Sequence, residues 1–147
     1  MKRCMMVVAL LILATAVHAQ EYSTARAQMQ HKYNTRFLSE HLKQTEESLL
    51  KAMQDSSLGI QTSAIQTIRE LEELFTAYPF ALLLSPLESK LRDENADAVV
   101  RRLSALALDG LHSEAGDAVI RDVAKSTEDK GLQALCNALL VKGGLYK

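Results

Sequence analysis

The chain has 147 residues, of which 48% are hydrophobic and 24% charged, and its formal net charge is −1. This balance is typical of a globular protein. It lacks the basic excess that nucleic-acid-binding proteins show, which argues against a nucleic-acid partner.

The N-terminus has the layout of a secretory signal peptide. Two basic residues near the start precede an apolar run over residues 5–16, and the small residue Ala19 stands before Gln20. The alternative is a membrane anchor, but a transmembrane helix needs about 20 apolar residues and this run is shorter. We therefore predict a signal peptide over residues 1–19, cleavage after Ala19, and an exported protein, periplasmic or secreted, without a stable membrane span.

The 128 residues from Gln20 onward carry a net charge of −3 and suit one domain. We expect a polar lead over residues 20–36, a helical domain over residues 37–142 and a short tail over residues 143–147. Cys136 is then the one cysteine left. Within its apolar surroundings, we interpret it as a small buried residue rather than a nucleophile.

Helical periodicity begins at residue 37 and continues to residue 53, and a second apolar stripe runs over residues 60–75. Pro79 ends that second helix. The run Phe80–Leu84 is apolar on all sides, so it is either buried core or a surface for a partner or a second copy. The pattern Ser85-Pro86-Leu87-Glu88 predicts the start of a short helix, continuous with Phe80–Leu84 only through a kink at Pro86.

The remaining helices have polar residues at their predicted first turns. Asn95 or Asp97 caps the next helix, Ser113 the one after it, and Thr127 the last, which a glycine pair at residues 143–144 ends. No stretch alternates as a strand does. The sequence therefore predicts an all-α fold of three helix pairs joined by short turns.

Three stretches repeat one helical pattern: Met53–Leu71, Leu91–Leu108 and Val123–Leu140. In the second helix of each pair, Gln61, Arg101 and Gln133 take equivalent places. The middle copy, with Asp93 after Leu91, then Val100-Arg101, then Ala107-Leu108 and Leu111, resembles the HEAT-repeat family.

That resemblance implies a short right-handed α-solenoid of about three HEAT-like helical hairpins. It also implies that Asp93 and Arg101 form a ladder between neighbouring repeats, although Gln61 and Gln133 stand where the outer copies would carry arginine. The alternative is a helical bundle whose helices share the same periodicity.

The residues that could carry chemistry are scattered. The histidines lie far apart, at positions 18, 31, 41 and 112, and no pair has metal-ligand spacing. We interpret Arg69, Glu70, Glu72 and Glu73 as a solvated charged face. No catalytic, cofactor or metal set is predicted, and we do not expect an enzyme.

Stacked helical hairpins usually bind other macromolecules. The sequence therefore predicts a protein that binds a protein or peptide partner on the surface of its second helices. The candidate contact residues are exposed polar positions of those helices: Gln66, Arg69, Glu73, Arg102 and Asp109. The alternative is a structural subunit of an envelope assembly. Neither the partner's identity nor the oligomeric state follows from the sequence.

Overall fold

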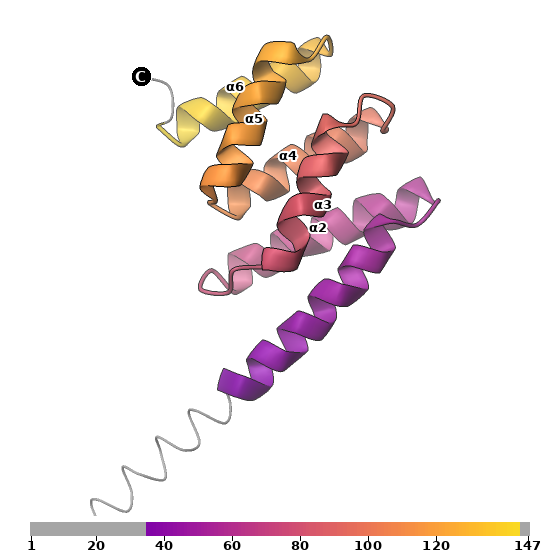
Figure 1. Ribbon diagram of the computed structural model, residues 1–147, viewed down its shortest axis with the longest axis vertical. Helices are drawn as coiled ribbons and strands as arrows, with labels where there is room; N and C mark the ends of the chain where they lie inside the picture. Colours follow the sequence, from indigo (N-terminus) through magenta and orange to yellow (C-terminus); the bar gives the residue numbers. More distant parts are fainter. Residues whose placement is uncertain (1–34, 145–147) are drawn as a thin grey trace, which may run out of the picture. The chain divides into compact units, whose positions relative to one another are not determined.

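The computed structural model describes residues 35–144 (Figure 1). The predicted signal peptide and nearly all of the predicted polar lead lie outside these described residues. The chain divides into two compact units, Met1–His41 and Leu42–Lys147. In the first unit, residues 35–41 are helical, and the rings of Phe37 and His41 meet edge to face with centroids 4.1 Å apart.

The second unit is built from helices. Residues 42–53 form one, and five more follow: α2 (Leu58–Leu74), α3 (Ala81–Arg92), α4 (Ala98–Gly110), α5 (Glu114–Ser126) and α6 (Lys130–Lys142). The described residues contain no strand, which confirms the predicted all-α fold. Over residues 35–144, no helix has both the length and the apolar character needed to cross a membrane.

The helices of the second unit pack in two sets. α3 packs against α4, and α5 against α6, because a short turn folds each pair back on itself. In addition, α2, α4 and α6 pack in succession, and α3 packs against α5. In Figure 1, α3 and α5 lie in front of α2, α4 and α6. α4 contacts α2, α3, α5 and α6, and its buried side chains include the small Ser104, Ala105 and Ala107, which permit that close packing.

The core follows helical spacing. Leu83, Leu87 and Leu91 of α3 are fully buried, as are Ile65 and Ile68 of α2. The apolar run Phe80–Leu84 belongs mainly to this core, since Phe80 and Leu83 have no exposed surface, whereas Leu82 is 43% exposed.

The predicted start of α3 at Pro86 is wrong, whereas the alternative, a helix continuous with Phe80–Leu84, agrees with the structure. The helix begins at Ala81, after Phe80 in the left-handed conformation (φ 42°), and Pro86 lies inside it. Proline lacks the N–H that would bond to the carbonyl four residues earlier, which normally disfavours a helix interior. Burial of the continuous stripe Leu83, Leu87 and Leu91 outweighs this loss, so tertiary packing overrides the local cap signal.

Glu46 supplies the cap that the sequence around α3 lacks. Phe80 makes no side-chain cap. Instead, one carboxylate oxygen of Glu46 accepts the backbone N–H of Leu82 at 3.1 Å, and the other accepts the Tyr78 hydroxyl at 2.8 Å. Glu46 is 3% exposed. A carboxylate at a helix N-terminus also interacts favourably with the helix dipole, so this contact fixes the start of α3 against residues 42–53.

Tyr78→Phe is expected to lower the free energy of unfolding by about 1–2 kcal/mol, because it leaves a buried carboxylate oxygen of Glu46 without its hydroxyl donor. A urea melt of the variant and the wild type measures the difference. If the variant and the wild type unfold at the same urea concentration, the hydroxyl contact contributes nothing to stability.

Candidate functional site

A cleft of about 490 Å³ opens in the second unit where α2, α4 and α6 end. Each of these helices contributes residues from its last turns, and the segments that follow α2 and α4 complete the walls. The lining residues include both apolar and charged ones; the charged ones are Arg69, Glu72, Glu73, Asp109 and Lys142. The volume lies in the range of pockets that hold small ligands or a peptide side chain.

Glu72 is the least ordinary residue of this cleft. Its side chain lines the cleft, yet the residue is only 7% exposed. Its Oε1 atom has no hydrogen-bond partner within the described part of the chain. Its carboxyl group lies against Gly110, where the Cβ of any other residue would clash with it. A buried, unsatisfied carboxyl group costs stability, and such groups concentrate at functional sites.

The surroundings of Glu72 favour its neutral form. The pKa of the Glu72 carboxyl is raised from 4.5 to about 8. Burial is the largest cause, Arg69 opposes it, and Glu73 and Asp109 add to it. Burial acts because a charged carboxylate loses hydration that no partner replaces. At neutral pH this carboxyl group therefore holds a proton that a nearby cation would displace.

The other charges of the cleft are paired loosely. Lys142 Nζ lies 3.3 Å from Asp109 Oδ2, and the lysine side chain is 76% exposed. The Asp109 side chain is only 18% exposed, so the pair is exposed on the lysine side alone. Six apolar or aromatic residues also line the cleft: Phe75, Tyr78, Phe80, Leu106, Leu111 and Leu139. The lining of the cleft is therefore both charged and apolar.

The structure brings together three of the five predicted partner-contact residues. Arg69, Glu73 and Asp109 all line the cleft. Gln66 is exposed on α2 but does not line it, and Arg102 lies near the opposite end of α4.

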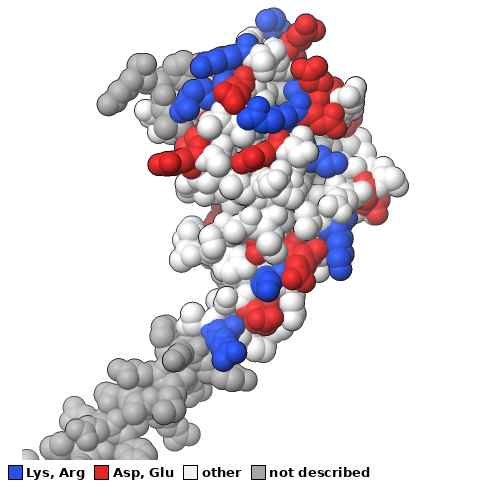
Figure 2. All heavy atoms as spheres, viewed as in Figure 1, with Lys and Arg blue, Asp and Glu red and all other residues white. Residues whose placement is uncertain are grey.

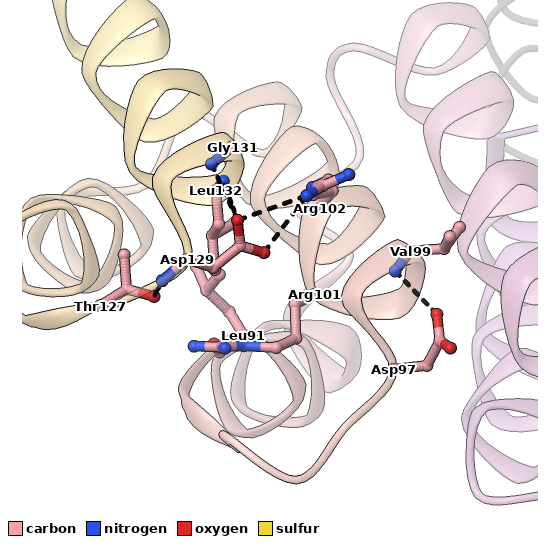
Figure 3. Close-up of polar contacts among 9 residues, drawn as sticks. All are labelled: Leu91, Asp97, Val99, Arg101, Arg102, Thr127, Asp129, Gly131 and Leu132. Atoms are coloured by element: carbon pink, nitrogen blue, oxygen red, sulfur yellow. Dashed lines mark hydrogen bonds and ion pairs between the residues drawn. The ribbon is translucent and has the colours of Figure 1, made fainter.

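Arg102 makes a contact between helices instead. Its Nη2 atom donates to both carboxylate oxygens of Asp129, at 3.3 and 3.2 Å (Figure 3). Asp129 is the N-cap of α6, and hydrogen bonds from the amides of Leu132 and Gly131, together with Arg102, hold the pKa of its carboxyl below the usual value. Arg102 therefore joins α4 to the start of α6.

Asp93 and Arg101 do not bond to each other within the described residues, and the ladder between neighbouring repeats that the resemblance implies stays a prediction. Arg101 Nε donates to the backbone carbonyl of Leu91 at 3.2 Å (Figure 3), while Asp93 accepts the amide of Asn95 in its own turn. The last carbonyl groups of a helix lack partners within that helix, and Arg101 satisfies the one at Leu91.

This contact recurs in all three helix pairs. Gln61, Arg101 and Gln133 are each the fourth residue of α2, α4 and α6. Each donates a side-chain N–H to a backbone carbonyl at the end of the preceding helix or in the turn that follows it. The accepting oxygens belong to Asp55, Leu91 and Ala124, at 2.5, 3.2 and 3.1 Å respectively. The repeat seen in the sequence therefore has one shared structural role.

Of the predicted helix caps, those of α4 and α5 are confirmed, whereas those of α3 and α6 are wrong. Asp97 caps α4 through the amide of Val99, as Figure 3 shows, and Ser113 caps α5. The last helix is capped by Asp129 rather than by Thr127, whose hydroxyl accepts the Asp129 amide. Asp129 is the cap because its carboxylate accepts hydrogen bonds from two free amides of the first turn.

Cys136 is fully buried, as predicted, and burial raises the pKa of its thiol to about 11. The thiol therefore stays protonated near neutral pH, which makes it a poor nucleophile and a poor metal ligand. Among residues 35–144 there is also no cluster of three histidine, cysteine or acidic side chains placed to hold a metal ion.

The interpretation of residues 69–73 as a solvated face holds for Glu70 and Glu73 but is wrong for Glu72. The sequence does carry a signal for it. Glu72 follows Ile65 and Ile68 at spacings of seven and four residues, which places it on the buried face of α2. The sequence carries no such signal for the cleft residues His112 and Lys142, because they line the cleft only through the way the ends of α4 and α6 are placed in the fold.

Charged residues of both signs are interspersed over α5 and α6 on the face seen in Figure 2. A nucleic-acid surface would need a stripe of one sign, which this face does not present. No protein-family model matches the sequence, and neither a curated protein nor a solved structure shows significant similarity to it.

Proposed function

We propose that this is an exported, non-enzymatic helical-repeat protein that binds a protein or peptide partner. The cleft at the ends of α2, α4 and α6 carries the proposal, because three helices converge there on charged groups and an apolar wall. Large exposed apolar side chains adjoin the lining residues in sequence: Leu74, 73% exposed, follows Glu73, and Val141, 65% exposed, precedes Lys142. Surfaces of this mixed character are typical of protein recognition.

The proposed architecture is a short right-handed α-solenoid of HEAT-like hairpins. Two observations support it: α2, α4 and α6 pack in succession, and their fourth residues make the same side-chain contact to the preceding helix. In a bundle whose helices merely share a period, nothing would require equivalent positions to make equivalent contacts.

We favour a binding function over catalysis because of the chemical groups that the cleft contains. The buried, protonated thiol of Cys136 lies outside the cleft. The Glu72 carboxyl group lies against Gly110. Thr76, Tyr78, His112 and Lys142 also line the cleft, but the described residues contain no hydrogen bond or ion pair from any of them to Glu72. A carboxyl group without a base or nucleophile partner serves as a binding group.

Site-specific photo-crosslinking in the native cell tests the proposal. A photoreactive residue at Thr76, exposed and lining the cleft, is expected to yield a defined adduct. The double variant Glu73→Lys/Asp109→Lys should lose most of that adduct. The matched control Glu94→Lys/Glu128→Lys makes the same charge change at the opposite ends of α4 and α6 and should retain it.

Equal adducts in the two double variants would contradict the role of the cleft. A ladder of adducts of the protein with itself, unaffected by either double variant, would favour the structural-subunit alternative. Turnover of a substrate by the purified protein would overturn the non-enzymatic part of the proposal.

A further inference from the structure

The cleft is short of one positive charge whenever Glu72 is ionised. Its formal charges are then three negative, on Glu72, Glu73 and Asp109, against two positive, on Arg69 and Lys142. The carboxyl ends of α2, α4 and α6 converge on the same place. Each helix end carries about half a negative charge from its unpaired carbonyl groups and favours a cation.

The residues that line the cleft indicate which kind of cation would fit it. Glu72 lines the cleft, is only 7% exposed and has one carboxyl oxygen without a hydrogen-bond partner among the residues described. Aromatic and aliphatic residues, including Phe75 and Leu106, line the same cleft. A guanidinium group matches a carboxylate in two parallel hydrogen bonds, stacks on aromatic faces and carries an apolar stem. An arginine side chain satisfies all three features.

We propose that the cleft accepts an arginine side chain of the bound peptide, with the Glu72 carboxylate as its counter-ion. This inference rests on the proposed function, because it names the chemistry by which the same cleft recognises its peptide partner. Arg69 does not fill this role in the structure: the hydrogen bonds and ion pairs of the described residues do not include one from Arg69 to Glu72.

Proton release follows from the same contact. Near neutral pH the free protein holds a proton on Glu72, whose pKa is raised to about 8 by burial. An arginine guanidinium stays charged across this range, so its binding favours the ionised carboxylate and expels the proton. Affinity for arginine should therefore rise with pH, by up to about tenfold per unit, until it levels off above about pH 8.

The test must distinguish the titration of Glu72 from that of the other titratable groups of the cleft. Those facing it are Glu73 beside it on α2, Asp109 on α4, His112 after α4 and Lys142 on α6, with Arg69 as the fixed charge. His112 has a positive φ of 48°, so asparagine, which tolerates that conformation, is the suitable replacement. His112→Asn should leave the rise of affinity with pH in place.

The test is isothermal titration calorimetry of the full chain with acetyl-Gly-Arg-Gly-amide and with the same peptide carrying citrulline, a neutral isostere of arginine. At about pH 9 the arginine peptide is expected to bind at least about tenfold more tightly. Near pH 7, buffers of different ionisation enthalpy should report release of up to one proton. Glu72→Gln should abolish both effects, whereas the exposed control Glu94→Gln should abolish neither.

Equal affinity of the two peptides, retention of both effects in Glu72→Gln, or binding of neither peptide at millimolar concentration would each overturn the inference. None of these outcomes removes the charge-dependent crosslink from Thr76. Loss of that crosslink would instead count against the proposed function itself, so the two failures are distinguishable.

Discussion

Arg101→Ala is expected to lower the free energy of unfolding by about 1–3 kcal/mol, because it removes a buried donor and leaves the Leu91 carbonyl unsatisfied. Arg101 is 8% exposed, and its Nε atom joins the start of α4 to the end of α3. Loss of the arginine stem from the α3–α4 interface adds to the effect. Chemical denaturation followed by circular dichroism measures it.

A conservative variant separates this contact from the charge. Arginine Nε and glutamine Nε2 are both bonded to Cδ, so glutamine places its N–H at the same reach, as Gln61 and Gln133 do in the other two pairs. Arg101→Gln should therefore keep most of the stability that Arg101→Ala loses. Arg92→Ala is the matched control: its ion pair with Asp122 is about half exposed and should contribute at most about 1 kcal/mol.

Two outcomes would contradict this account. If Arg101→Gln is as unstable as Arg101→Ala, then the positive charge matters and the shared N–H contact does not. If Arg101→Ala has the same free energy of unfolding as the control Arg92→Ala, then the contact to Leu91 contributes nothing to stability.

Glu72→Gln is expected to raise stability, and to raise it more as the pH increases. In the wild type the pKa of Glu72 is about 8 in the folded state, against 4.5 for an ordinary glutamate. Between these two values the folded state holds a proton that the unfolded state has lost. Stability therefore falls as the pH rises through this window, and the loss is complete above about pH 8. Glutamine carries no charge at any pH, so the variant does not undergo this loss of stability.

The gain of Glu72→Gln over the wild type should be smallest near pH 4 and reach about 1–3 kcal/mol near pH 9. Urea melts across this range measure it. Glu73→Gln, on the exposed neighbour, is the control and should show no comparable trend. A difference between Glu72→Gln and wild type that stays constant from acid to alkaline pH would show that Glu72 has an ordinary, solvated carboxyl.

A site whose binding group lowers stability is consistent with recognition. The protein tolerates an unsatisfied carboxyl group in a cleft that a partner can fill, and the binding free energy offsets the loss. Gly110 has a matching role, since its missing Cβ leaves the space that the Glu72 carboxyl occupies.

The sequence by itself determined the helical class and the repeat. Apolar spacing located the stripes of α2, α4 and α6, and local signals placed the caps Asp97 and Ser113, because helix periodicity and capping depend on neighbours within one turn. The equivalence of Gln61, Arg101 and Gln133 was also visible, because offsets within a repeat survive changes of residue type.

The tertiary structure decided everything that depends on which helix ends meet. α3 begins at Ala81 because Glu46, far away in sequence, caps it, and this overrides the local signal at Ser85-Pro86. The cleft arises because α2, α4 and α6 end on one side, which brings Glu72, Asp109 and Lys142 together. Burial then sets the charge state of Glu72, since hydration is lost only when these three helices pack, and no spacing along a single helix records that loss.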